Sequence, residues 1–344
     1  MVALTGQLDE QKRKVSFDTY DITVQQLVSM FRDGAIDVAP AYQRQYRWDV
    51  GRQSRLIESL FLGIPVPSLF MAANADGTWE LVDGVQRMFT LIHFVGEEGV
   101  RTKAHLTTEL ELSGLEKLSD FNGFTFTRLP NSVRLQFLLR PVKVVTLNDK
   151  SDLVVRFDLF ERLNTGGLPL TAQEIRSCIY RGEFDSFLEK LSQYKPFRAV
   201  VRLPASAEKD GTRQEFVLRF FAYLHDAARF KHSVLSFLNE YMADASKSFA
   251  YGENESLFTK TFDSLAKALP RGLSRRNNHT TPVNLYEAVA VGAARVLQHG
   301  KLRTAGMSTW IRSPELRKLT TGATNSPRMV NGRIEFCRAK FAGE

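Results

Sequence analysis

The feature that most constrains this chain is a change of periodicity within residues 79–94, WELVDGVQRMFTLIHF. Residues 79–82 have the composition of a buried strand, Asp83-Gly84 is a tight-turn dipeptide, and residues 86–94 carry apolar side chains at helical spacing. A strand that leads directly into a helix leaves backbone N–H groups unpaired at the positive end of the helix dipole. The segment therefore predicts an anion-binding turn inside an α/β module.

Charged side chains flank this turn. Arg87 falls in the first helical turn, where its guanidinium could contact a phosphate in a bidentate manner, and Asp83 could hold Mg²⁺ or orient a water molecule. A purely structural interpretation stays open, in which Asp83 caps the helix and Arg87 is a surface charge.

A second segment, residues 40–49, concentrates aromatic and arginine side chains in the sequence PAYQRQYRWD. Such side chains can stack on a base and pair with its phosphates, or they can fill a hydrophobic corner of the fold. The dipeptide Gln43-Arg44 is repeated at Gln86-Arg87, which suggests that both segments face one anionic ligand.

A third segment, residues 157–176, reads as helix, Asn-Thr-Gly-Gly break and second helix. Thr171 and Glu174 have the spacing of a capping box at the start of that second helix. Arg162 and Asn164 are polar residues at the end of the first helix, although a structural turn explains the pattern equally well.

The periodicities predict an α+β protein, with an α/β module followed by an all-helical region. We place the domain boundary near residue 200, which gives domains 1–200 and 201–344. Strands are expected at 67–72, 78–82 and 142–147, and residues 35–40 form a short apolar run. Helices are expected at 23–31, 53–62, 86–94, 153–163, from 171, and at 214–230, 233–243, 254–268, 284–298 and 314–319.

The net excess of positive charge is confined to the end of the chain. Residues 265–344 contain 14 Lys and Arg against four Asp and Glu, a net charge of +10, whereas residues 1–150 and 151–264 each carry −1. An excess of positive charge favours binding to a polyanion such as DNA. The alternative is a basic surface that is only solvated by water. The candidate DNA-binding residues are Arg271, Arg275, Arg276, Arg312, Arg317 and Lys318.

The cysteine content and the apolar segments of the sequence argue against a zinc protein, a redox protein and a membrane protein. The two cysteines, Cys178 and Cys337, are far apart and fit buried thiols in a reducing cytoplasm better than a zinc or redox site. The longest apolar stretch is interrupted by glycine and proline and is too short to span a bilayer, so no membrane association is expected.

In this order, the motifs resemble the GmrSD-type N-terminal domain family, which has a ParB/sulfiredoxin-like fold and a DGQQR motif. The resemblance covers residues 20–182, and its specificity lies in the ordered combination of motifs. The matching segments are PAYQR at 40–44, LIESLFLGIPVP at 56–67, DGVQR at 83–87, FERLNTGG at 160–167 and LTAQEIR at 170–176.

The resemblance implies nucleotide binding, NTP hydrolysis in some members, and a role in modification-dependent DNA restriction and defence against bacteriophage. It implies a catalytic set of Asp83, Gln86 and Arg87, with Mg²⁺ on Asp83, and it places further nucleotide contacts at Gln43, Arg44, Gly84, Arg162 and Asn164. Val85 stands where the family motif has its first glutamine, so the resemblance supports nucleotide hydrolysis less directly than nucleotide binding.

Many relatives carry an HNH nuclease domain, but the six scattered histidines of this chain lack the spacing of such a site. The expectation is a stand-alone subunit of the GmrS kind, a candidate Mg²⁺-dependent NTPase that acts on DNA with a separate HNH-type nuclease and could form a homo-oligomer. The alternatives are a non-catalytic DNA-binding or adaptor protein with a vestigial pocket, and a nuclease with a metal site unlike HNH.

Overall fold

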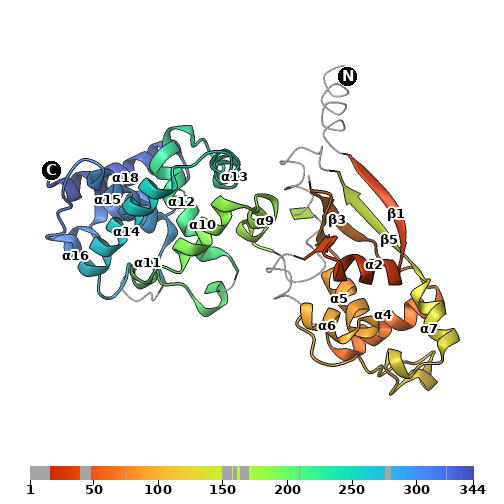
Figure 1. Ribbon diagram of the computed structural model, residues 1–344. Helices are drawn as coiled ribbons and strands as arrows, with labels where there is room; N and C mark the ends of the chain where they lie inside the picture. Colours follow the sequence, from red (N-terminus) through yellow and green to blue (C-terminus); the bar gives the residue numbers. More distant parts are fainter. Residues whose placement is uncertain are drawn as a thin grey trace, which may run out of the picture. The chain divides into compact units, whose positions relative to one another are not determined.

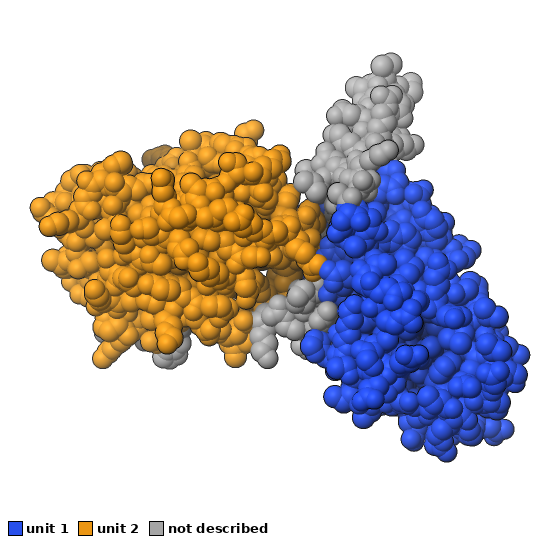
Figure 2. All heavy atoms as spheres, in the orientation of Figure 1, with its two compact units in different colours: residues 1–170 blue, residues 171–344 orange. Residues whose placement is uncertain are grey.

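The computed structural model describes residues 16–38, 48–74, 76–148, 157, 161–162, 170–208, 210–275, 280–322 and 324–344. The chain divides into two compact units, residues 1–170 and residues 171–344 (Figure 2). The described part of the first unit combines a sheet with helices, and the described part of the second unit is helical (Figure 1). This arrangement confirms the predicted α+β class with its helical C-terminal region.

A five-stranded sheet organises the first unit. Its strands lie in the order β1-β5-β3-β4-β2, with β1/β5 and β3/β4 antiparallel and β3/β5 and β2/β4 parallel. Three of these strands, β3, β4 and β5, were expected. Strand β1 was not, because it is an edge strand that carries aspartates and exposed side chains. Strand β2 has only two residues and lies in the apolar run 35–40, for which no strand was predicted. The bounds are β1 Phe17–Thr23, β2 Ile36–Asp37, β3 Leu69–Ala73, β4 Trp79–Asp83 and β5 Pro141–Leu147.

The helices of this unit gather beside the sheet (Figure 1). They are α2 Val24–Arg32, α4 Val50–Leu62, α5 Val85–Val95, α6 Glu98–Lys103 and α7 Asn131–Leu138, with 3-10 turns at Ser119–Phe121 and Phe126–Arg128. The three helices expected here are confirmed, and α4 begins earlier than expected because Asp49 accepts the N–H of Arg52 at 2.8 Å and caps the helix. Phe61, Phe94 and Phe137 pack ring against ring between these helices, with centroids 4.6–6.3 Å apart.

The second unit is a bundle of helices. Its elements are α9 Ala172–Ile179, α10 Glu183–Ser192, α11 Lys195–Val200, α12 Thr212–Asp226, α13 Val234–Ala245, α14 Tyr251–Ala268, α15 Val283–Leu297, α16 Met307–Trp310, α17 Pro314–Thr320 and α18 Pro327–Ala342, with 3-10 turns at Ala205–Glu208 and Ala227–Arg229. The predicted capping box of α9 is present. Both cysteines are buried, as expected.

A chain of ion pairs runs through the interior of this unit. Arg176 of α9 donates to Glu215 of α12, Glu215 also accepts from Arg219, and Arg219 donates to Glu287 of α15 at 2.7 Å. Glu287 in turn pairs with Arg333 of α18. Since Arg176, Glu287 and Arg333 are fully buried, the network fixes how these four helices pack.

The boundary between the two compact units falls between Leu170 and Thr171 in the sequence, whereas composition suggested a domain boundary near residue 200. The difference arises because α9, α10 and α11 bury their apolar faces among the later helices. Phe197 of α11, for example, lies 4.9 Å from Phe262 of α14 between ring centroids. The helix expected at 153–163 lies mostly outside the described residues; Phe157, Glu161 and Arg162 are helical.

Candidate functional site

The strand-to-helix turn is built on one glycine. Gly84 has a φ of +99° and stands at the N-terminus of α5, where no side chain forms a capping hydrogen bond. A Cβ at this position would come within 2.4 Å of Leu69 Cδ2. The turn therefore requires glycine, and it leaves the positive end of an 11-residue helix without a capping side chain.

The two charged residues of the turn bind each other. Arg87 Nη2 donates to Asp83 Oδ2 at 2.9 Å and to the carbonyl oxygen of Ser68 at 3.0 Å. Arg87 Nε is buried and finds no hydrogen-bond partner among the described residues. The structure thus brings Asp83, Gly84 and Arg87 together as the sequence predicts, and it gives Arg87 one donor with unused capacity.

Gln86 contacts the backbone just before α4, and its predicted role in the nucleotide site stays a prediction. Its Oε1 accepts the backbone N–H of Trp48 at 3.1 Å, and the carbonyl oxygen of Trp48 accepts from Nε2 of Gln53 at 2.8 Å. Gln53 Oε1 lies 2.8 Å from Nδ1 of His93. Sequence reasoning missed Gln53, although its position in phase with Leu56 and Leu60 places a polar residue on an apolar helix face, which is a usable signal.

Val85 is buried, with 7% of its surface exposed. At this position the side chain therefore packs in the core of the unit and offers no hydrogen bond to a ligand. A glutamine in its place would have to bury or redirect an amide.

Among the described residues, the turn offers Mg²⁺ one carboxylate ligand. Asp83 is a single carboxylate, 31% exposed, and the described residues contain no group of three or more His, Cys, Asp or Glu side chains that could hold a metal ion. Mg²⁺ often binds through one carboxylate, the phosphates of its nucleotide and water. Asp83 could hold the ion in that manner.

The remaining predicted nucleotide contacts are not assembled by the described structure. Gln43, Arg44 and Asn164 lie outside the described residues. Arg162 is described and exposed on its helix. These four assignments stay predictions.

The predicted DNA-binding residues lie in the second unit. Arg271, Arg312, Arg317 and Lys318 are exposed, and Arg276 lies outside the described residues. Arg275 donates to both hydroxyls of Thr320 and Thr321, and its pKa is lowered by burial and then by the nearby charge of Arg317. Arg333, which contributes to the charge excess, is fully buried with Glu287 and contributes nothing to a surface.

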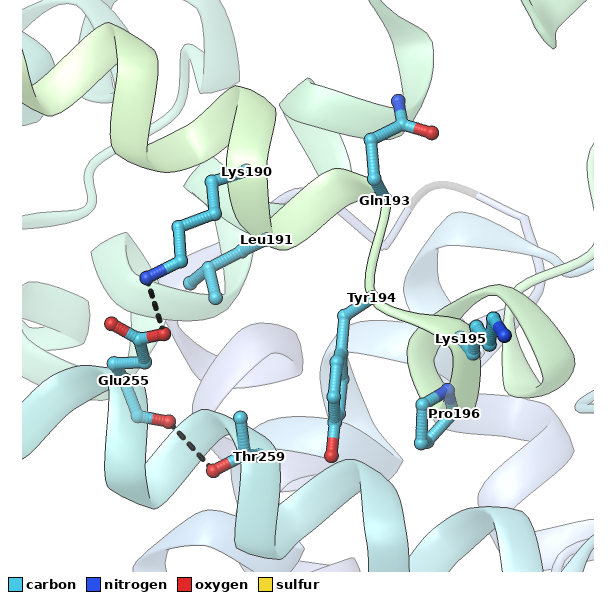
Figure 3. A pocket seen from close by; sticks show the side chains of 8 residues that line it. All are labelled: Lys190, Leu191, Gln193, Tyr194, Lys195, Pro196, Glu255 and Thr259. Atoms are coloured by element: carbon cyan, nitrogen blue, oxygen red, sulfur yellow. Dashed lines mark hydrogen bonds and ion pairs between the residues drawn. The ribbon is translucent and has the colours of Figure 1, made fainter.

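A separate open pocket of about 600 Å³ lies where α10 and α11 meet α14 (Figure 3). Its charged groups are largely satisfied within the protein: Lys190 pairs with Glu255 at 2.6 Å, and the Tyr194 hydroxyl donates to Asp263 at 2.8 Å. The pocket therefore offers less to a ligand than its size suggests.

None of the helices in the described ranges is both long and apolar enough to cross a bilayer. No curated protein matches the chain at a significant level. One family model does match: residues 24–181 match the N-terminal domain of the GmrSD restriction endonuclease. The match begins at the first residue of α2, includes the complete strand-turn-helix described above, and ends just after α9. Residues 24–181, slightly less than half of the chain, are therefore similar to the N-terminal domain family of the GmrSD restriction endonuclease.

Proposed function

We propose that the Asp83–Arg87 turn binds the phosphates of a nucleoside triphosphate together with Mg²⁺. The observation that carries this proposal is the joint position of the uncapped α5 N-terminus and Arg87, whose Nε has no partner in the described structure. Backbone N–H groups and a guanidinium at one point are the donors that phosphate oxygens require.

The match of residues 24–181 to the GmrSD restriction endonuclease N-terminal domain supports a role in restriction-type defence. We accordingly propose that the protein is the nucleotide-binding, DNA-associated component of a modification-dependent restriction system. The exposed basic residues of α17, Arg317 and Lys318, supply the DNA contacts in this proposal. In this proposal a separate HNH-type nuclease subunit cleaves the DNA.

Isothermal titration of the full chain with each of the four NTPs and Mg²⁺ tests the site. Arg87→Ala should weaken binding about ten- to a hundredfold, since a charge-assisted hydrogen bond is worth about 1.5–3 kcal/mol. Arg32→Ala is the matched control, because Arg32 is an exposed arginine of the same unit, paired with its neighbour Asp33. If wild type and Arg87→Ala gave equal heats of nucleotide binding, the assignment of the turn as the nucleotide site would be wrong.

A second candidate function is nucleotide binding without hydrolysis, in an adaptor protein. Two observations favour it: Val85 is buried in the core, and Oε1 of Gln86 is taken by Trp48. Phosphate release by the purified chain separates the two functions. Binding with no release, in the presence of DNA and Mg²⁺, would assign the adaptor role.

A further inference from the structure

Helix α17 exposes basic side chains while its other residues are anchored in the second unit. Arg317 and Lys318 are exposed, whereas the adjacent Leu316 is fully buried. Ser313 caps the N-terminus, because its Oγ accepts the N–H of Leu316 at 3.2 Å. At the other end of the helix, Thr320 is only 4% exposed. A helix of seven residues is too short to be stable alone, so its orientation depends on these anchors.

The C-terminal end of α17 is held by Arg275, which lies 45 residues before Thr320 in the chain. Nη2 of Arg275 donates to the carbonyl oxygen of Thr320 at 3.2 Å and to its Oγ1 at 2.6 Å, and Nη1 donates to Oγ1 of Thr321 at 2.5 Å. The carbonyl oxygens at a helix C-terminus have no partner within the helix, and a cation is favourable there. Arg275 therefore supplies both hydrogen bonds and charge to the last turn of α17.

The hydroxyl of Thr320 connects this anchor to the preceding turn. It donates to the carbonyl oxygen of Leu316 at 2.7 Å, so its lone pairs are left to accept from the guanidinium. The chain after α17 is also fixed, because Thr324 accepts from Asn284 at 2.6 Å and from Arg333 at 2.8 Å. Side chains of other elements thus hold both the last turn of α17 and the chain that follows it.

Arg275 and Arg317 differ in how far their guanidiniums are engaged. Three of the five N–H donors of Arg275 are used within the protein, all on neutral partners. Arg317 is exposed and lies four residues before Thr321, so both arginines lie near the same end of α17. Burial, and then the charge of Arg317, lower the pKa of Arg275. Arg275 therefore belongs to the framework that holds α17, whereas Arg317 is exposed to anions in solution.

We propose that Arg275 is a positioning residue for DNA binding: it fixes the last turn of α17, so that Arg317 and Lys318 meet backbone phosphates in one preset geometry. This inference rests on the proposed association with DNA. A side chain that is fixed before binding loses less conformational entropy when the complex forms, which raises affinity without a new contact. Arg275 then acts on DNA through α17 and not through a phosphate contact of its own.

Arg275→Lys separates these two roles because it keeps the positive charge. An ammonium cannot reproduce the planar fork that reaches Thr320 and Thr321 together, yet it still attracts a phosphate. We expect DNA affinity, measured by fluorescence anisotropy at low salt, to fall about five- to tenfold, as for the loss of one hydrogen bond. Wild-type affinity in this variant would overturn the proposal.

Arg338→Lys is the matched control. The guanidinium of Arg338 also makes three hydrogen bonds, to Glu335 and Glu344, and none of them reaches α17. The same substitution should therefore leave DNA affinity near that of wild type. A loss equal to that of Arg275→Lys would show a general effect of removing guanidinium contacts, and the proposal would be wrong.

Thr321 provides a second test that leaves every charge in place. Thr321→Val removes the hydroxyl that accepts from Arg275, at an exposed position whose extended backbone suits valine. DNA affinity should fall about threefold, and Thr321→Ser should restore it. Added to Arg275→Lys, Thr321→Val should cause no further loss, because both remove the same hydrogen bond. Losses that simply add would mean that Thr321 contacts DNA by itself, which contradicts the proposal.

Failure of this inference differs from failure of the proposed function. Thermal unfolding first checks that each variant is folded. If wild type binds no DNA at low salt, the proposed DNA association fails and this inference with it. If Arg317→Glu with Lys318→Glu weakens binding while Arg275→Lys and Thr321→Val do not, only the inference fails.

Discussion

Arg87 donates a hydrogen bond to Asp83, four residues earlier in the chain and across the Gly84 turn, with 2.9 Å between Nη2 and Oδ2. The two charges neutralise each other, so an anion at the turn must compete with the Asp83 carboxylate for the guanidinium. A divalent cation on Asp83 would remove that competition. The ion pair therefore predicts that nucleotide and Mg²⁺ bind better together than separately.

Asp83→Asn tests this prediction directly. Without Mg²⁺ the variant should bind NTP about fivefold more tightly than wild type, because the competing carboxylate charge is gone, a difference of roughly 1 kcal/mol. With Mg²⁺ it should still bind but release no phosphate. Calorimetry with and without chelator, and a phosphate-release assay, give both results; unchanged affinity in chelator would contradict the competition.

Gly84→Ala should destabilise the first unit by about 3 kcal/mol. The positive φ of +99° alone costs a non-glycine residue about 1–2 kcal/mol, and the new Cβ would also press on Leu69, which is fully buried. Gly77→Ala is the control, since Gly77 has a similar φ of +84° but open space around it. Urea unfolding should show a clearly larger loss for Gly84→Ala, and equal losses would refute the role of the close contact.

Glu287→Gln should destabilise the second unit by about 3–5 kcal/mol, because it leaves the guanidiniums of Arg219 and Arg333 without their shared carboxylate in the interior. Glu335→Gln removes an exposed carboxylate from the same helix as Arg333 and should cost under about 1 kcal/mol. Thermal unfolding of the full chain compares them. A loss for Glu287→Gln no greater than for Glu335→Gln would mean that the network contributes little.

Asp185 gives the second unit a pH dependence. Burial raises the pKa of Asp185 from its ordinary 3.8 to about 6, so the folded chain holds this proton more tightly than the unfolded chain. The free energy of unfolding should therefore fall as pH rises from about 4 to 6. Asp185→Asn should stabilise the protein by roughly 2 kcal/mol at pH 8 and by nothing at pH 4. A constant difference across this range would exclude Asp185 as the titrating group.

Binding to DNA should depend steeply on salt. If about five phosphate contacts form, log K should fall with log[salt] at a slope near −4 to −5. Arg317→Glu with Lys318→Glu should flatten the slope by about 2 and weaken binding to every sequence alike. Arg229→Glu is the control, since Arg229 is already surrounded by Asp226 and Asp244. Fluorescence anisotropy measures the slopes, and no binding at low salt would leave these residues as a solvated surface.

The turn itself could be predicted from sequence because its information is local. The change of period at Asp83-Gly84 marks both elements, and only glycine tolerates the backbone conformation found there. The capping box at Thr171 is likewise a local signal, and the structure confirms it.

The other features of the site and of the core depend on which side chains contact one another, and hydrophobic periodicity does not reveal these partners. Nothing near Gln53 in the sequence indicates that Trp48 and His93 are its partners, and the role of Gln86 depends on a residue 38 positions away. The burial of Arg333 is hidden for the same reason, because its partner Glu287 is on another helix. Strand β1 was not predicted because an edge strand need not alternate buried apolar side chains with exposed polar ones.

The segment that matches the family and the compact units of this chain have different boundaries, and Arg176 lies between those boundaries. The family region ends at residue 181 and includes α9, yet the guanidinium of Arg176 is neutralised by Glu215, which lies beyond that end. A fragment truncated after residue 181 would contain the whole matched segment, yet Arg176 would have lost its counter-ion Glu215. Dissection of this protein by limited proteolysis or recombination should therefore respect the break before Thr171.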